Sequence, residues 1–114
     1  MNKIMVFLAA LLFATATLAE HGNPLVPGQP LVIDVRTAGE YRQSHVSEAV
    51  NIPFDEIAGR IAAFAPDRDA RIVLYCRSGR RSGIAEQTLR ELGYHQVENK
   101  GGLHDMRRGG YRID

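Results

Sequence analysis

Short apolar segments alternate with segments of helical periodicity along most of this chain, and the alternation restricts the folds that it can adopt. Continuous apolar runs of about four or five residues are typical of buried strands. Apolar residues three or four positions apart, such as Ile57, Ile61 and Phe64, form one face of a helix. An alternation of strands and helices predicts an α/β domain, in which helices cover both faces of a parallel sheet.

Capping and turn signals set the expected limits of these elements. Thr37, with Glu40 three residues later, matches a capping box. Pro53 suits the first position of a helix, and Gly93 suits the end of one. The expected strands are residues 31–35, 48–52, 71–75 and 96–98, and the expected helices are residues 37–44, 53–64, 84–92 and 103–108. This pattern predicts one small domain with a central sheet of about four to five strands.

The N-terminal segment has the pattern of a secretory signal peptide. Lys3 supplies the positive charge, residues 4–18 form an uncharged, mostly apolar run, and the small residues Thr17 and Ala19 stand at positions −3 and −1 of a cut after Ala19. Cleavage after Ala19 would remove residues 1–19 and leave a domain of residues 20–114. We therefore expect a periplasmic protein without a stable membrane anchor after cleavage.

Two other interpretations of this segment stay open at the level of sequence. The segment could be retained as a membrane anchor, although the run over residues 4–18 is shorter than the roughly 20 residues that a spanning helix needs. Cleavage could also follow Ala16, which would leave Leu18 close to the new terminus.

Composition excludes several classes of function. The 14 basic and 13 acidic residues nearly cancel, so the broad basic face of a nucleic-acid-binding protein is not expected. A single cysteine forms no intramolecular disulfide and no cysteine-based zinc site. His21, His95 and His104 are scattered without the spacing of metal ligands. We expect neither a metal nor an organic cofactor.

The candidate catalytic residue is a cysteine that lies between a predicted strand and a predicted helix. Cys76 directly follows the apolar run of residues 71–75, and ligands of parallel sheets bind beyond the carboxyl ends of the strands. Backbone N–H groups of a loop that curls into a helix can hold an anion, and a sulfur there is favoured as thiolate. Gly79 lets the loop bend. Taken alone, Cys76 could be a buried, inert thiol. Three arginines follow it within five residues, however, and an inert position does not need them: Arg77, Arg80 and Arg81.

This segment resembles the active-site loop of the rhodaneses, the thiosulfate sulfurtransferases. The loop motif of that family is Cys-Arg-x-Gly-x-Arg/Thr, and Cys76-Arg77-Ser78-Gly79-Arg80-Arg81 matches every defined position. Other family segments are matched by Asp34-Val35-Arg36, Glu40-Tyr41, His45-Val46, Asn51-Ile52-Pro53, Leu92-Gly93-Tyr94, Val97 and Gly101-Gly102. The chain departs from the family at Ser44, where Gly is usual, and at Met106, where many members carry Trp.

The resemblance implies a rhodanese-like fold, a reaction and a set of site residues. A thiolate at Cys76 would take the outer sulfur of thiosulfate and pass it, as a persulfide, to a thiophilic acceptor such as cyanide or a thiol. The implied substrate-binding residues are Arg77, Ser78, Gly79, Arg80, Arg81 and Ser82. Asp34 and Arg36 are expected to form a supporting ion pair that braces the loop, or a plain strand-end pair without catalytic effect.

Two other functions use a similar loop. Dual-specificity phosphatases need an arginine six positions after the cysteine, whereas Arg81 is five positions after Cys76 and position six is Ser82. The shorter loop makes a cup that is sized for one sulfur atom and disfavours a phosphatase or an arsenate reductase. A sulfide-carrying or redox-sensing module without turnover would have the same loop, and activity measurements with thiosulfate and cyanide distinguish it from an enzyme.

Overall fold

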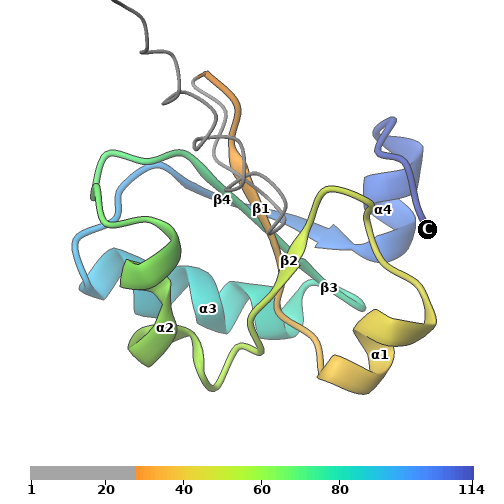
Figure 1. Cartoon of the computed structure of the whole chain (residues 1–114), viewed down its shortest axis with the longest axis horizontal. Coiled ribbons are helices and arrows are strands. Elements are labelled where there is room, and N and C mark those ends of the chain that lie inside the picture. The colour runs from red at the N-terminus through yellow and green to blue at the C-terminus, as the bar shows by residue number, and fades with distance from the viewer. Residues whose placement is uncertain (1–27) are drawn as a thin grey trace, which may run out of the picture.

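A computed structural model describes residues 28–114, which contain four strands and four helices (Figure 1). The proposed signal peptide, residues 1–19, lies outside the described residues. The strands are β1 (Leu31–Asp34), β2 (Val50–Asn51), β3 (Ile72–Cys76) and β4 (Val97–Gly102). The helices are α1 (Ala38–Gln43), α2 (Ile57–Phe64), α3 (Arg80–Glu91) and α4 (Leu103–Arg108). The α/β prediction is confirmed, with four strands in the described part of the chain.

All four strands are parallel and lie in the order β2-β1-β3-β4. The register places Asp34, the last residue of β1, opposite Tyr75 of β3. An irregularity in the β3–β4 pairing then places Cys76 opposite Gly102. The carboxyl ends of β1, β3 and β4 therefore meet at one edge of the sheet, and the loops that follow them lie close together.

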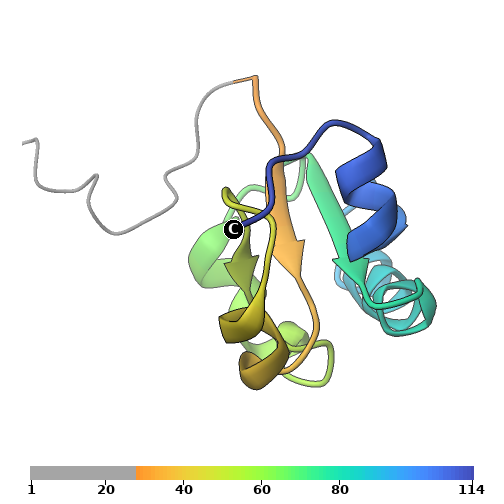
Figure 2. The ribbon, with the colours of Figure 1, turned by 90° about the vertical axis from the view of Figure 1, so that its right-hand side faces the viewer.

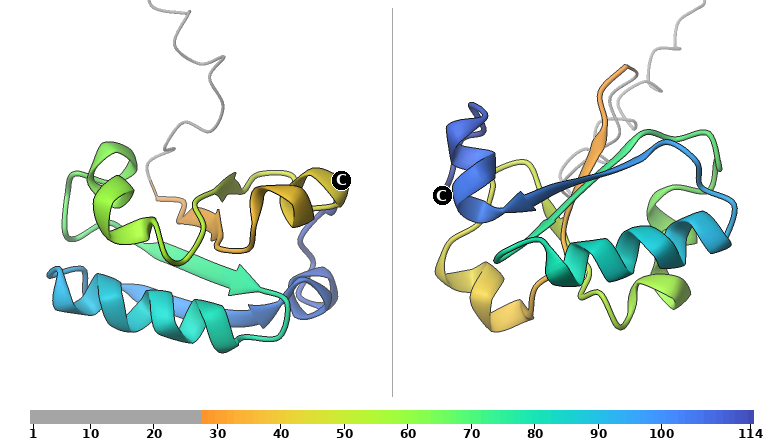
Figure 3. Two further views of the ribbon diagram at one scale, coloured as in Figure 1. Left: turned by 90° about the horizontal axis from the view of Figure 1, so that it is seen from below. Right: turned by 180° about the vertical axis from the view of Figure 1, so that it is seen from behind.

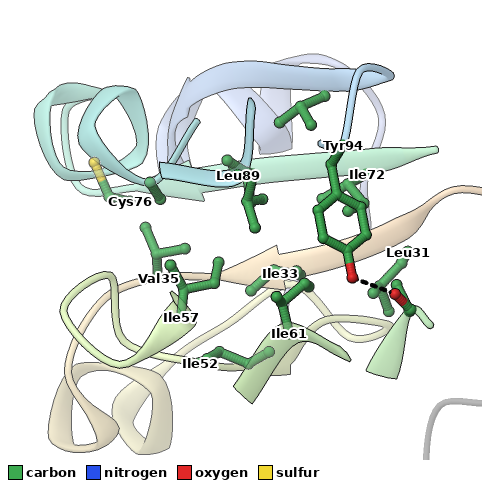
Figure 4. Packing of buried hydrophobic residues seen from close by; sticks show 14 residues of the cluster. Leu31, Ile33, Val35, Ile52, Ile57, Ile61, Ile72, Cys76, Leu89 and Tyr94 are labelled. Carbon is green, nitrogen blue, oxygen red and sulfur yellow. Dashed lines mark hydrogen bonds between the residues drawn. The ribbon is translucent and has the colours of Figure 1, made fainter. Parts of the chain in front are cut away.

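Helices cover both faces of the sheet (Figure 3). On one face, α2 and α3 pack against alternate residues of β1 and β3, with Ile57, Ile61 and Leu89 in contact with Ile33 and Ile72 (Figure 4). The Tyr94 hydroxyl closes this layer by donating a hydrogen bond to the carbonyl oxygen of Ala65. None of the helices within residues 28–114 has the length and apolar content needed to cross a lipid bilayer.

The other face is covered by α1, α4 and the C-terminal segment. Met106 of α4 and Tyr41 of α1 pack against Val73 and Tyr75 of β3. The last residues of the chain lie beside the segment that follows α1, where Val46 and Ile113 form an isolated antiparallel bridge (Figure 2).

The second helix begins later than its sequence pattern predicts. Pro53 suits a helix start, but α2 begins at Ile57. The backbone N–H groups of Ile52 and Phe54 donate to the carbonyl oxygens of Asp34 and Val35, so the chain stays extended along β1 before it turns. Tertiary hydrogen bonding thus holds residues 52–54 against the end of β1, and the chain makes a turn over residues 54–56 before α2 begins.

Candidate active site

Cys76 is the last residue of β3, and its side chain belongs to the apolar layer under α2 and α3 (Figure 4). Only 1% of the residue is exposed. The sequence pattern predicts a helix from residue 84, but α3 already begins at Arg80. Gly79 precedes it with φ of 104°, a left-handed conformation that suits glycine. The loop between the cysteine and the helix is therefore short and turns sharply at Gly79.

The short loop surrounds the sulfur with hydrogen-bond donors. The backbone N–H of Gly79 donates to Cys76 Sγ over 2.9 Å, and the Ser82 hydroxyl lies 3.4 Å from the same atom. Burial by itself raises the pKa of the Cys76 thiol. Hydrogen bonds to the sulfur outweigh burial and lower the pKa; the donors are the Ser82 hydroxyl and the backbone N–H groups of Ser82, Gly79 and Ser78. The site therefore favours a thiolate at a lower pH than a free cysteine does.

Asn99 of β4 holds the loop in place, and sequence analysis did not identify it. Its side-chain amide donates to the carbonyl oxygen of Gly79 over 3.0 Å. Its oxygen accepts a hydrogen bond from the backbone N–H of Gly101 (2.9 Å) and lies 2.7 Å from the hydroxyl of Ser82, whose single proton is shared between this oxygen and Cys76 Sγ. The sequence carries one related signal, the glycine pair two residues later. At Gly102 a Cβ would overlap the carbonyl oxygen of Arg77, so β4 approaches the loop more closely than a side chain allows.

We expect the Ser82→Ala variant to need a higher pH for reaction at Cys76. Loss of a hydrogen bond to a charged group costs about 1.5 kcal/mol or more, so the rate should fall about tenfold at pH values where the thiolate is the minor form. The rate of alkylation of Cys76 by iodoacetamide, measured against pH, tests this. Ser78→Ala is the control, because only the backbone of Ser78 stabilises the thiolate. An unchanged pH profile for Ser82→Ala would mean that the hydroxyl donates to Asn99 instead.

The three loop arginines differ in their surroundings. The Arg81 guanidinium forms two hydrogen bonds with the Glu40 carboxylate of α1, at 2.9 and 3.0 Å. The Arg77 side chain is 78% exposed and lies 3.7 Å from the same carboxylate. Arg80 is exposed and has no ion pair within residues 28–114. The guanidinium of Arg81 lowers the pKa of Glu40 to about 2, so the carboxylate is ionised and largely neutralises Arg81.

Glu40 is a second site residue that sequence analysis did not assign. The sequence predicted Glu40 only as part of a capping box, and its hydrogen bonds with Thr37 confirm that box. The sequence does not show that the same carboxylate also reaches Arg81 at the start of α3. Glu40 therefore joins two helices that lie on opposite faces of the sheet.

Asp34 and Arg36 form a buried ion pair, as the sequence analysis expected. Arg36 Nη2 lies 2.6 Å from Asp34 Oδ2, and Arg36 Nε lies 2.9 Å from Asp34 Oδ1. The Tyr75 hydroxyl also donates to Asp34, over 2.7 Å, and accepts a hydrogen bond from the N–H of Val46. Burial and the neighbouring Asp34 carboxylate raise the pKa of Tyr75, which keeps this donor protonated. The network ties the end of β1 to β3, one residue before Cys76.

No group of three or more histidine, cysteine, aspartate or glutamate side chains lies close enough within residues 28–114 to hold a metal ion. The described site offers one thiol, the backbone donors around it and nearby arginines.

Comparison with known proteins agrees with this geometry. Residues 17–107 match the family described as the rhodanese-like domain. The chain belongs to the rhodanese family. A thiosulfate sulfurtransferase of Escherichia coli, PspE, is 49% identical to this rhodanese over 74 residues, which are 65% of this chain and 71% of that one. A sulfurtransferase of Allochromatium vinosum is 38% identical over 84 residues, covering 73% and 77% of the two chains.

Solved structures support the same assignment. A structure described as a rhodanese with anions, from Escherichia coli, superposes with a TM-score of 0.70 at 42% identity and covers 75% of this chain and 98% of that one. A thiosulfate sulfurtransferase from Pseudomonas aeruginosa superposes with a TM-score of 0.67 at 32% identity, covering 73% of this chain and 16% of that one. The predicted family, fold class and sulfurtransferase activity are thus confirmed.

Proposed function

We propose that this rhodanese transfers the outer sulfur of thiosulfate to cyanide or a thiol through a persulfide on Cys76. The observation that carries the proposal is the ring of donors around Sγ, which favours the thiolate in spite of burial. Cys76 is the only cysteine of the chain, so any persulfide must form on it. A buried and inert thiol would not require donors that stabilise its charged form.

The reaction has two steps. The Cys76 thiolate attacks the outer sulfur of thiosulfate, the S–S bond of thiosulfate breaks, and sulfite leaves with the bonding electron pair. The acceptor then attacks the outer sulfur of the persulfide, and the Cys76 thiolate is released. Preorganised N–H groups of the loop stabilise the negative charge on sulfur at both stages. This sequence of bond changes requires neither a metal nor an organic cofactor.

Intact-mass measurement tests the proposal directly. Incubation with thiosulfate should add one sulfur, about 32 Da, because a single nucleophile takes a single atom. Cyanide should then remove this mass and form thiocyanate. A protein that gains no sulfur while its thiol stays reactive would be a redox-sensing module and not this enzyme.

In this proposal the loop from Arg77 through Ser78, Gly79, Arg80 and Arg81 to Ser82 binds thiosulfate. Arg77 and Arg80 are exposed and carry most of the uncompensated positive charge, which attracts the dianion. Arg81 is held by Glu40 and so contributes mainly by fixing the first turn of α3.

We expect the Arg81→Ala variant to use thiosulfate poorly while keeping its fold. Without its bonds to Glu40, the first turn of α3 and the loop N–H groups that bind thiosulfate are held less firmly, so kcat/KM for thiosulfate should fall about tenfold, which corresponds to about 1.4 kcal/mol. The variant also leaves the Glu40 carboxylate with only the 3.7 Å contact to the exposed Arg77, so its charge beside the loop repels a dianion. Adding Glu40→Gln to Arg81→Ala should therefore recover part of the loss.

Arg71→Ala is the matched control for Arg81→Ala. Arg71 precedes β3 at the opposite end from the cysteine, and its side chain binds only the carbonyl oxygen of Gly28 within residues 28–114. Equal losses of kcat/KM in the Arg71→Ala and Arg81→Ala variants would contradict the role given to Arg81.

We also propose that residues 1–19 direct the protein to the periplasm and are removed there. The support is Lys3, the apolar run of residues 4–18, and the small residues Thr17 and Ala19 at positions −3 and −1 of the cleavage site. N-terminal sequencing of the exported protein should find Glu20 first. Thr17 as the first residue would indicate cleavage after Ala16, and an intact Met1 in the membrane fraction would show that the segment is an anchor.

A further inference from the structure

A cleft of about 380 Å³ opens between α1, the active-site loop and α4. Its walls include Arg36 and Glu40 on the α1 side, Arg77 of the loop, and Leu103 and Arg107 of α4. Figure 3 shows α1 and α4 on the same side of the molecule, where β3 and β4 end. The volume exceeds what thiosulfate needs and falls in the range of sites for small organic ligands, about 300–1,000 Å³.

The strand register places this cleft at the carboxyl end of the cysteine-bearing strand, although the buried Cys76 side chain is not itself part of its wall. Cys76 of β3 lies opposite Gly102 of β4. Arg77 and Leu103 are the residues that directly follow this pair, and both line the cleft. The cleft therefore begins where the cysteine-bearing strand ends, beside the loop that we propose holds thiosulfate.

The charge of the cleft is positive once its internal ion pairs are considered. Arg36 is neutralised by Asp34, and Glu40 is engaged by Arg81. Arg107 is exposed and has no ion pair within the described residues. Arg77 has only the 3.7 Å contact with Glu40. Two guanidinium groups with little compensation thus face the cleft, one from the loop and one from α4, and the partly buried Leu103 adds an apolar wall.

We propose that this cleft binds the sulfur acceptor and selects small thiols that carry a carboxylate or sulfonate group. The proposal rests on the proposed function, because it requires a persulfide on Cys76. The anionic group of the acceptor lies against Arg107 and Arg77, and its carbon chain lies along Leu103. Its thiolate attacks the outer sulfur of the persulfide, the S–S bond breaks, Cys76 becomes a thiolate, and the acceptor leaves as a persulfide. Arginine suits this role because its planar group pairs with carboxylates and sulfonates.

The second step can be measured by itself. The persulfide enzyme is prepared with thiosulfate, separated from the donor, and mixed with 3-mercaptopropionate or with 2-mercaptoethanol at low ionic strength. Loss of the added sulfur mass gives the rate for the anionic and the neutral thiol. The ratio of the two rates should fall about threefold in Arg107→Ala and about tenfold in Arg107→Glu, relative to wild type, since the contact is an exposed ion pair. Added salt should reduce the wild-type ratio.

Arg108→Ala is the matched control, because Arg108 lies in the same last turn of α4 and does not line the cleft. It should keep the wild-type ratio. Equal decreases in the Arg107 and Arg108 variants would show that general surface charge acts and not the cleft, and an unchanged ratio in Arg107→Glu would exclude the cleft as the acceptor site. Failure of wild type to form a persulfide is a separate result, seen before any thiol is added, and it would overturn the proposed function and this inference together.

Discussion

Cys76→Ser should gain no sulfur from thiosulfate and should form no thiocyanate, whereas the wild-type protein should do both. The variant has no sulfur nucleophile, since Cys76 is the only cysteine of the chain. A serine hydroxyl stays protonated at neutral pH, and the donor ring that stabilises a thiolate does not make it a comparable nucleophile. Intact mass after thiosulfate treatment and a thiocyanate assay measure the two steps.

The substitution is close to isosteric, so unfolding by urea should show a free energy of unfolding near that of wild type. This control separates loss of the nucleophile from loss of the fold. Thiocyanate turnover that persists in Cys76→Ser would contradict both the persulfide mechanism and the alternative of a redox-sensing module, because each depends on this thiol.

Asp34→Ala should lower the free energy of unfolding by about 3–5 kcal/mol, the cost of removing one partner of a buried ion pair. Asp34 is fully buried and Arg36 is 6% exposed, so the arginine would keep its charge away from water without a counterion. The Tyr75 hydroxyl would also lose its acceptor. Domains are stable by only about 5–15 kcal/mol, so a loss of this size is large. Urea unfolding measures it.

Asp69→Ala is the comparison for this prediction. The Asp69 carboxylate pairs with His95 on the surface, with 75% of its side chain exposed, and exposed pairs contribute less than about 1 kcal/mol. If Asp34→Ala does not fold, Asp34→Asn retains an acceptor oxygen and should show an intermediate loss. Equally small effects of the Asp34 and Asp69 variants would contradict the bracing role of the buried pair.

Elements that depend on neighbours in the sequence were predictable. The capping box at Thr37 marked the start of α1, and the apolar run before Cys76 marked β3. The starts of α2 and α3 were misplaced by several residues. For α2 the reason is the pair of hydrogen bonds that hold the preceding chain beside β1. For α3 the reason is the left-handed turn at Gly79, because it starts the helix inside a polar segment that lacks helical periodicity.

The amino-acid sequence by itself determined the candidate nucleophile and the loop around it, because that motif is contiguous and its chemistry depends on adjacent backbone groups. Only the tertiary structure decided which side chains hold the loop in place. Glu40 and Arg81 are 41 positions apart, and Asn99 is 20 positions from Gly79. Strand order and register bring these residues together. A pattern with the period of a helix or a strand carries no information about contacts at such separations.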